Sequence, residues 1–396
     1  MVPRCKGVIR VGFVLTFRNQ EWLGGVSYFR NLFAAILAQP NRRIEPVIIT
    51  RTDTPAGTLD GFGKCQVIQT KLVEQDAMTW KVRRASQVFL SRDFLFERLL
   101  AQHDIRALSH SGHLGRHSRI PTLTWIPDFQ ERTLPEFFSP AERQARARGL
   151  KEACTHANAI LLSSYAAHND LSAIDRDCAA KSRVLQFVCS VPEPTALLSR
   201  EEVCRRYEIQ GPYFLLPNQF WAHKNHLVVV QALARLRDAG RRLIVLTTGS
   251  PHDHRQPHHF GSLRERVRQL GVEAQFRVLG LVPYIDLMSL ISESIAIINP
   301  SLFEGWSTTV EEAKSMGKLV VLSDIPVHRE QAPERAIFFD PRDPEALARA
   351  LEDANAHWDQ KAERQHMHAA TSKLPRRVKA FADRYQEIVL DLVGVS

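Results

Sequence analysis

The 396-residue chain lacks several patterns that define common protein classes. No apolar run approaches the roughly 18 residues of a membrane-spanning helix. The apolar stretch at residues 8–15 contains Arg10, unlike the core of a signal peptide. The glycine fingerprint G-x-G-x-x-G is missing, which disfavours a Rossmann dehydrogenase. We therefore expect a cytoplasmic protein that can also lie peripherally on the inner face of the cell membrane.

Cysteine is also scarce, and no two cysteines form a C-x-x-C pair. The six stand at positions 5, 65, 154, 178, 189 and 204. This scatter predicts reduced thiols and no structural zinc site. The histidines between residues 252 and 259 are interpreted as part of a solvated insertion, and the D-x-D at residues 175–177 as a surface feature. We expect no bound metal.

Positive charge is concentrated in the first half of the chain. Residues 1–200 hold 27 Lys and Arg against 18 Asp and Glu, and residues 201–396 hold 25 of each. Such a surface attracts anionic lipid, phosphorylated ligands or nucleic acid. No RNP-like pattern, zinc finger or basic heptad supports nucleic acid. The expected partner is an anionic membrane or phosphate-bearing acceptor, met by Arg83, Arg84, Arg143, Arg146 and Arg148.

Short apolar runs alternate with amphipathic helical segments, which predicts an α/β protein. The predicted strands of the first half lie at 8–17, 46–50, 105–109, 122–126, 159–162 and 184–188. Those of the second half lie at 213–217, 243–248, 277–281, 295–298 and 319–322. Residues 51–80 look irregular, and residues 81–101 are predicted as one long helix. The predicted domains are 1–190 and 206–375, with a linker at 191–205 and a final helix at 376–396.

One strand–loop–helix–strand unit stands out at residues 297–331. The buried run at 295–298 ends at Asn299-Pro300, and a loop with Glu304 and Gly305 follows. A helix is predicted from Thr308 to Gly317, because glycine is typical just past a helix end. The loop therefore lies at the carboxyl end of a strand, where open α/β sheets bind ligands.

The predicted helix start brings hydroxyls and free backbone N–H groups together at residues 307–309, an arrangement that favours phosphate. Thr308 and Glu311 fit a capping box. Glu304 from the loop and Glu312 from the helix can face one ligand. Because Glu311 is assigned to the cap, Glu312 is the carboxylate predicted to bind the ligand.

Phe-Glu-Gly-Trp-(x5)-Glu, followed by Met-Gly-Lys-Leu-Val-Val-Leu-Ser-Asp, resembles the donor-site signature of GT-B glycosyltransferases of the large retaining family 4. In that family two glutamates are separated by seven residues, as Glu304 and Glu312 are here. The resemblance implies that Glu304 holds donor-sugar hydroxyls and Glu312 the ribose. It also implies two Rossmann-like domains facing each other across a cleft, with the donor held mainly by the second and the final helix packing on the first.

Other segments resemble the family less completely. The Gly24-Gly25 loop before the first predicted helix is similar to the loop that faces the donor diphosphate. Lys224 matches a diphosphate-binding Lys, but Asn218 stands where the family has Arg. The loop with Val282 corresponds to the one beside the nucleotide base. Asp128 matches the Asp of a strand-end His-Asp pair, in which Pro127 replaces His.

The resemblance implies transfer of a hexosyl group from a nucleotide-diphosphate sugar, a co-substrate rather than a cofactor, to a hydroxyl of a saccharide or lipid-linked acceptor. Retention and a role in bacterial polysaccharide, lipopolysaccharide or glycolipid synthesis are implied by the family only. The catalytic candidates are Lys224, Glu304 and Asp128. The donor-binding candidates are Gly24, Gly25, Asn218, Lys224, Val282, Glu304, Gly305, Trp306, Ser307, Thr308, Thr309 and Glu312.

Two alternatives stay open from the sequence. A sugar-nucleotide epimerase has the same fold, and the substitutions at Asn218 and Pro127 are compatible with a catalytically silent scaffold that binds nucleotide sugars. The nucleotide base, the sugar and the acceptor are likewise open.

Overall fold

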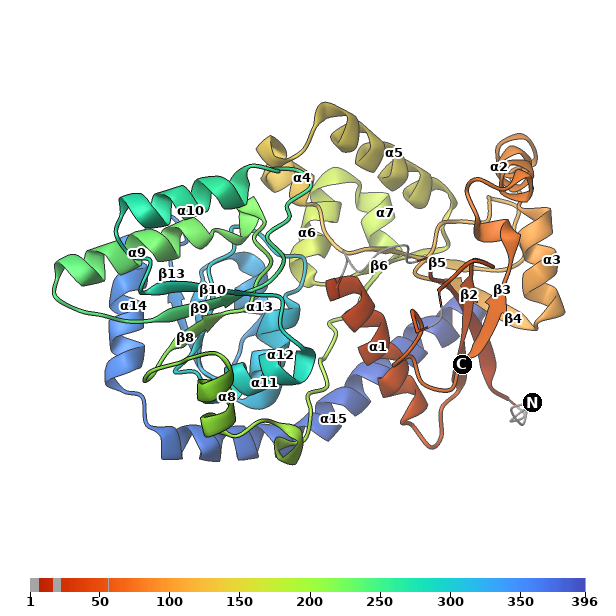
Figure 1. Ribbon diagram of the computed structural model, residues 1–396. Coiled ribbons are helices and arrows are strands. Elements are labelled where there is room, and N and C mark those ends of the chain that lie inside the picture. Colours follow the sequence, from red (N-terminus) through yellow and green to blue (C-terminus); the bar gives the residue numbers. More distant parts are fainter. Residues whose placement is uncertain (1–6, 17–22, 56, 396) are drawn as a thin grey trace. The chain divides into compact units, whose positions relative to one another are not determined.

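The computed structural model describes residues 7–16, 23–55 and 57–395, and the chain forms two compact units (Figure 1). Unit 1 comprises the chain up to Phe129, then Pro140–Phe187, and the chain from Arg376 onward. Unit 2 comprises Gln130–Ser139 and Val188–Pro375. No helix among the described residues is long and apolar enough to cross a bilayer.

The sheet of unit 1 has seven parallel strands in the order β3-β2-β1-β4-β5-β6-β7. The order reverses direction between β1 and β4, so their carboxyl ends border a switch point of the Rossmann type. The strands are β1 Ile9–Val14, β2 Ile44–Thr50, β3 Gln66–Gln69, β4 Ile105–Ser109, β5 Thr122–Ile126, β6 Ala159–Leu162 and β7 Ser182–Val184.

The sheet of unit 2 has six parallel strands in the order β10-β9-β8-β11-β12-β13. Its switch point lies between β8 and β11. The strands are β8 Phe214–Leu216, β9 Val245–Thr248, β10 Phe276–Gly280, β11 Ile297–Asn299, β12 Val320–Ser323 and β13 Ala336–Phe339. The two sheets confirm the predicted α/β class with two Rossmann-like units.

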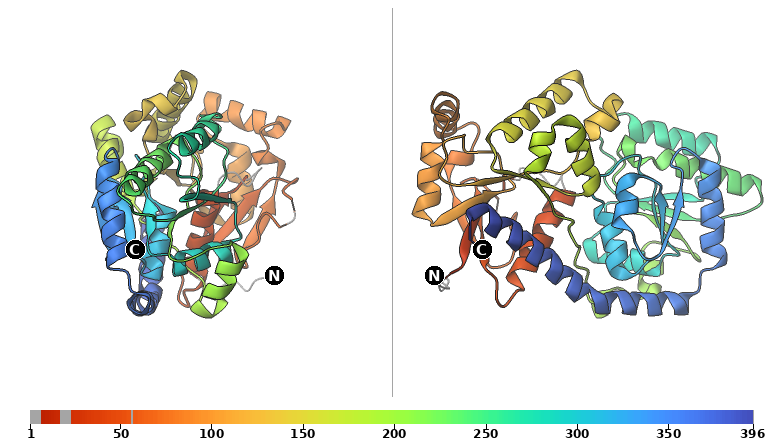
Figure 2. Two further views of the ribbon diagram at one scale, coloured as in Figure 1. Left: turned by 60° about the vertical axis from the view of Figure 1, so that its left-hand side comes forward. Right: turned by 180° about the vertical axis from the view of Figure 1, so that it is seen from behind.

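Helices connect the strands in both units (Figures 1 and 2). Unit 1 has η1 Lys71–Val73, α1 Leu23–Leu37, α2 Met78–Leu90, α3 Phe94–Gln102, α5 Pro140–His156, α6 Tyr165–Ile174 and α7 Arg176–Ala180. Unit 2 has α4 Gln130–Thr133, η2 Pro135–Phe137, η3 Pro194–Ala196, α8 Arg200–Arg206, η4 Ala222–Lys224, α9 His226–Asp238, α10 His259–Gln269, α11 Tyr284–Glu293, α12 Thr308–Met316, α13 Pro326–Gln331 and α14 Pro344–Ala356.

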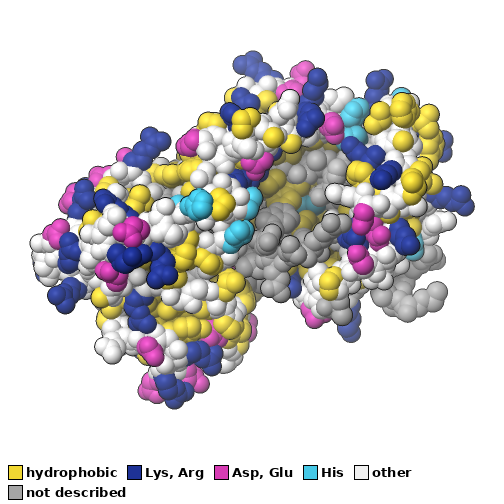
Figure 3. All heavy atoms as spheres, turned by 45° about the horizontal axis from the view of Figure 1, so that its top comes forward, with side chains coloured by type: hydrophobic (Ala, Val, Ile, Leu, Met, Phe, Trp, Pro, Cys, Tyr) yellow, Lys and Arg dark blue, Asp and Glu magenta, His cyan; other side chains and the backbone are white. Residues whose placement is uncertain are grey.

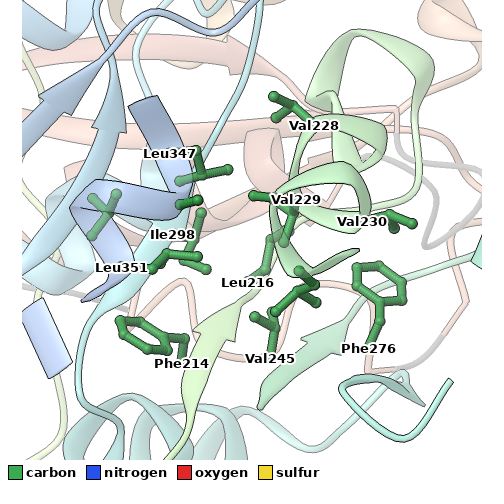
Figure 4. Packing of buried hydrophobic residues seen from close by; sticks show 14 of the residues in the cluster. Phe214, Leu216, Val228, Val229, Val230, Val245, Phe276, Ile298, Leu347 and Leu351 are labelled. Carbon is green, nitrogen blue, oxygen red and sulfur yellow. The ribbon is translucent and has the colours of Figure 1, made fainter. Parts of the chain in front are cut away.

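Apolar packing covers both faces of the unit 2 sheet. On one face, Phe214 and Ile298 of the strands pack with Val229 of α9 and Leu347 of α14 (Figure 4). On the other face, strand residues pack with α8, α11 and α12. Burial on both faces explains why these parallel strands are nearly continuous runs of apolar residues.

Residues 191–205, which were predicted as a linker, lie in unit 2. Val203 of α8 is fully buried in the core cluster that α11 also lines. Residues Gln130–Ser139, predicted within the first domain, also belong to unit 2, where the Arg255 guanidinium lies 4.1 Å from the Phe138 ring. The final helix is longer than predicted: α15 spans Gln360–Val393, with residues up to Pro375 in unit 2.

Two predictions in the first half of the chain also needed correction. The single helix predicted at 81–101 is two helices, because Ser91 adopts a left-handed conformation (φ 51°) and Asp93 caps α3 by accepting from the Phe96 N–H. Residues 51–80, predicted as irregular, include β3 and the start of α2. β3 is a short edge strand, and its sequence gives little periodicity.

Cys154 of α5 and Cys178 of α7 form a disulfide, with their Cα atoms 5.2 Å apart. The prediction of reduced thiols throughout was therefore wrong. The two cysteines are 24 residues apart, and only the packing of α5, β6 and α7 brings them together. Cys65, Cys189 and Cys204 are not part of a disulfide.

Candidate functional site

The loops at the carboxyl ends of β8 and β11 meet in unit 2 at the switch point of its sheet. The loop after β8 leads through η4 into α9, and the loop after β11 leads into α12. Asn225 joins the first loop to its neighbours, since its side-chain amide donates to the carbonyls of Pro300 and Pro341. Asn225 itself is in the left-handed region (φ 56°), a conformation that Asn tolerates well.

Lys224 and Glu304 form an ion pair at this point. The Lys224 Nζ lies 2.7 and 2.9 Å from the two carboxylate oxygens of Glu304. The side chains are 17% and 8% exposed, so the pair is nearly removed from water. The prediction had assigned them to different parts of one ligand, and the structure places their charges in direct contact.

The Glu304 carboxylate is held in its ionised form. Burial by itself would raise its pKa, but the neighbouring Lys224 ammonium lowers the pKa of Glu304 to about 2. The Ser301 hydroxyl also lies 2.7 Å from Glu304 Oε1. Glu304 therefore stays ionised beside Lys224 throughout the physiological pH range.

A buried amide network supports the loop. Asn299, the last residue of β11, donates to the Ser307 hydroxyl at 2.8 Å. Asn218 donates to Asn299 Oδ1 at 3.3 Å and accepts from the Thr309 hydroxyl at 3.3 Å. Asn218 is only 4% exposed, and both of its amide heteroatoms have protein partners. Its side chain therefore joins β8 to the start of α12.

The start of α12 differs from the predicted capping box. Ser307 is the N-cap, because its hydroxyl accepts from the Val310 N–H, and Thr308 is the first helical residue. The Ser307 backbone is fixed by Gln331, which accepts from its N–H and donates to its C=O. The Thr308 and Thr309 N–H groups begin the helix and have no acceptor one turn earlier within it, and such groups suit an anion. Gly305 and Trp306 are half-buried in the preceding loop.

The two adjacent glutamates of α12 have different surroundings. Glu311 is 1% exposed, accepts from Gln331 at 3.3 Å and lies 3.8 Å from Lys314 Nζ. Its role is structural, but it does not cap the helix. Burial raises the pKa of Glu312 to about 8, against the opposing effect of a hydrogen bond from Tyr284. Glu312 is therefore mostly protonated near neutral pH.

His328 of α13 is a buried residue that the sequence interpretation did not select. Its Nδ1 lies 2.9 Å from the Ser323 carbonyl oxygen, and its Nε2 has no hydrogen-bond partner among the described residues. Burial lowers the pKa of His328, although the Glu304 charge opposes this shift. The ring is therefore neutral near pH 7. Its position after the Ser-Asp-Ile-Pro loop that follows β12 was the available sequence signal.

The remaining candidates lie elsewhere. Gly24, Gly25 and Asp128 belong to unit 1. The two glycines are in the first turn of α1 rather than in a loop before it, and the rest of that predicted loop lies outside the described residues. Asp128 accepts from Arg146 Nη1 at 3.3 Å. Val282, in unit 2, is half-buried against the core cluster of α8, α11 and α12.

Unit 1 has a cavity of about 200 Å³ at the carboxyl ends of β1 and β4. Polar lining groups come from Ser111 and His113 after β4, and from Arg84 and Gln87 of α2. Trp80 of α2 adds an aromatic wall. The cavity thus lies at the switch point of this sheet, where α/β proteins bind ligands.

Residues 203–373 match the family described as glycosyl transferases group 1. This stretch is therefore similar to a group 1 glycosyltransferase domain. The match includes Lys224, Glu304 and Glu312, and it ends two residues before the unit boundary at Pro375.

Solved structures extend the likeness over both units of the chain. A glycosyltransferase from Rickettsia africae is 16% identical, with 98% of this chain and 100% of that one covered and a TM-score of 0.68. The Anabaena protein Alr3699/HepE, solved in complex with UDP and glucose, is 15% identical, with 96% and 99% covered and a TM-score of 0.67. The chain therefore has the GT-B fold.

A curated relative shares part of the sequence. The O-antigen chain mannosyltransferase RfbU of Salmonella typhimurium is 26% identical over 141 residues. The alignment covers 36% of this chain and 38% of RfbU, so this chain spans well under half of the length of the curated relative.

Proposed function

We propose that the protein transfers a hexosyl group from a nucleotide-diphosphate sugar to a hydroxyl acceptor, with retention of anomeric configuration. The observation that carries this proposal is the buried Lys224–Glu304 pair before the start of α12, at the switch point of a sheet whose residues match the group 1 family model. A fixed cation and a helix N-terminus together suit a diphosphate.

Each group has a role in the proposed reaction. Lys224 and the first-turn amides of α12 stabilise the negative charge that develops on the diphosphate as its bond to the anomeric carbon breaks. Glu304, held ionised, accepts hydrogen bonds from hydroxyls of the donor sugar. The acceptor oxygen bonds to the anomeric carbon, and its proton goes to the departing phosphate oxygen. No protein side chain is needed as the base.

Glu312 is proposed to bind the ribose. A ribose has two neighbouring hydroxyls, and a carboxylate accepts from both at once. The Glu312 carboxyl is mostly protonated in the free protein. Because only the carboxylate accepts from both hydroxyls, nucleotide binding would favour loss of the proton. This proposal predicts tighter nucleotide binding as the pH approaches 8.

The acceptor is proposed to be a saccharide or lipid-linked saccharide of bacterial polysaccharide or lipopolysaccharide synthesis. Support comes from the name of RfbU, an O-antigen chain mannosyltransferase, and from the cavity of unit 1, where Trp80 offers a stacking surface beside polar groups. The UDP and glucose bound by HepE support a nucleotide-sugar donor. Asp128, which follows β5 in unit 1, is proposed to take part in catalysis.

The test begins with thermal stabilisation of the purified protein by a panel of nucleotide-diphosphate sugars that includes UDP-glucose and a nucleotide-linked mannose. The best donor is then incubated with candidate acceptors, and NMR determines the anomeric configuration of the product. Retained configuration and a new glycosidic bond support the proposal. An epimerised nucleotide sugar formed without acceptor would identify an epimerase, and donor binding without product under every condition would identify a binding scaffold.

A further inference from the structure

Helix α2 of unit 1 exposes its apolar side chains. All residues of α2 are described, and none of them is buried. Met78 is 71% exposed, Val82 49% and Phe89 83%. Figure 3 shows hydrophobic side chains gathered over this helix, with Lys and Arg at the margin. Exposure of large apolar side chains on one element marks an interaction surface.

The exposed side chains form a stripe along one face of the helix. Met78, Val82, Ala85 and Phe89 follow one another at spacings of four, three and four residues, which places them on one side. The opposite side docks onto unit 1 through polar groups. Arg83 forms an ion pair with buried Asp93 at 2.8 Å, and Gln87 donates to the His113 carbonyl at 2.8 Å. This arrangement reverses the usual one, in which a surface helix buries its apolar stripe.

The apolar surface continues past the end of α2. We define the α2 patch as the large side chains exposed by at least 40% between residues 78 and 95. Its members are Met78, Val82, Val88, Phe89, Leu90, Phe94 and Leu95. One short region thus exposes seven large hydrophobic side chains.

The charges around the patch favour an anionic surface. Lys81 and Arg84 are exposed on α2 at one margin of the stripe, and the helix contains no Asp or Glu. An apolar stripe with a basic margin is the pattern of a helix that lies in the headgroup region of a membrane. A protein partner of acidic character would match the charge, but it would not require so continuous an apolar face.

We propose that α2 is a membrane-binding helix, which inserts the α2 patch into the headgroup and acyl boundary of an anionic bilayer. This differs from the charge-based expectation of the sequence in the residues responsible. Arg83 is engaged with Asp93, and Arg146 with Asp128, so neither is a free surface cation. The apolar stripe, which the sequence interpretation did not identify, supplies most of the contact.

The placement of α2 also bears on the acceptor, and this step rests on the proposed function. Trp80 and Gln87 on the inner side of α2, and Arg84 at its margin, line the cavity at the carboxyl ends of β1 and β4. A helix lying in the membrane surface therefore borders the proposed acceptor space. This geometry favours a lipid-linked acceptor, whose saccharide would enter the cavity from the headgroup region.

The test uses the full-length protein and sedimentation with vesicles, without donor or acceptor, so that its result is independent of glycosyl transfer. Vesicles of phosphatidylcholine are compared with vesicles that also contain phosphatidylglycerol. We expect binding to the anionic vesicles that weakens at high salt. The variant with Val82→Asp and Phe89→Asp should bind at least about tenfold more weakly, because the insertion of two apolar side chains is lost.

Val278→Asp is the matched control, since Val278 of β10 is 42% exposed and Val82 is 49% exposed. The control should bind like the wild-type protein. A second variant, with Lys81→Glu and Arg84→Glu, should lose about tenfold or more of its binding to anionic vesicles. Wild-type sedimentation with neither vesicle would overturn the proposal and make a protein the better partner. Full binding by the Val82→Asp, Phe89→Asp variant would overturn it as well.

Discussion

The Lys224–Glu304 pair in unit 2 and the α2 patch in unit 1 both depart from the usual distribution of side chains. In the first, two opposite charges are nearly buried. In the second, large apolar side chains stand in water. Both arrangements cost free energy in the isolated protein, since charges lose hydration and apolar groups stay hydrated. Both regions are therefore places to look for a ligand or partner. Buried charges indicate a charged or polar ligand, and exposed apolar side chains indicate an apolar partner.

The largest expected effect comes from dividing the ion pair. Lys224→Met leaves the Glu304 carboxylate buried without its cation, so the free energy of unfolding should fall by about 3 kcal/mol or more. Turnover should fall by a factor on the order of 10²–10³, because the leaving diphosphate loses a stabilising charge. Denaturant unfolding and steady-state kinetics measure the two effects.

A second substitution separates the two roles of Lys224. The double variant with Lys224→Met and Glu304→Gln buries no unpaired charge. Much of the lost free energy of unfolding should therefore return, whereas turnover should stay low. Recovery of both stability and turnover would remove Lys224 from the reaction.

The next largest effect concerns the two adjacent glutamates of α12. Glu312→Ala should weaken nucleotide binding by about 1.5–3 kcal/mol, the usual contribution of hydrogen bonds to a charged group. Glu311→Ala is the matched control, because Glu311 contacts Gln331 and Lys314 of the protein itself. Calorimetric titration with the nucleotide checks the order, and a larger loss in Glu311→Ala would reverse the assignment.

The stability of the free protein should depend on pH through Glu312. Because burial raises the pKa of this carboxyl to about 8, from an ordinary value of 4.5, the folded protein binds the proton more tightly than the unfolded chain. Below pH 4.5 the carboxyl of Glu312 is protonated in both states and does not change the free energy of unfolding. As the pH rises from there toward 8, it lowers the free energy of unfolding progressively. Between pH 6 and 8 the free energy of unfolding should fall by about 2 kcal/mol because of Glu312.

Glu312→Gln provides the comparison for this pH effect. The variant has no proton to lose at this position, so its stability should fall less than that of the wild-type protein over the same range. Parallel stability curves for the two proteins would show that the carboxyl is not protonated in the folded state. Denaturant unfolding at several pH values gives both curves.

The smallest expected effect is in the α2 patch. Phe89→Asp should change the free energy of unfolding by no more than about 0.5 kcal/mol, because the Phe89 side chain is 83% exposed. The same change at fully buried Phe214 should prevent folding, since it would bury an unpaired charge. A loss of several kcal/mol in Phe89→Asp would mean that this side chain is packed within the protein, contrary to its proposed contact with lipid.

The sequence alone determined the class of fold and much of the candidate donor site. Parallel strands buried on both faces are continuous apolar runs, and this local pattern was sufficient to place most of them. Glu304, Glu312 and the helix start after β11 lie within one short segment, so their spacing could be read directly. Lys224 was found because its loop, between a predicted strand and helix, resembles the diphosphate-binding loop of the family.

Only the tertiary structure decided which of these residues touch and which faces are covered. Lys224 and Glu304 are 80 positions apart, and Cys154 and Cys178 are joined across two helices. The stripe on α2 has the same periodicity whether it faces a core or water, because periodicity records which side chains share a face and not what lies against that face. That difference depends on packing between distant segments, which the local sequence does not contain.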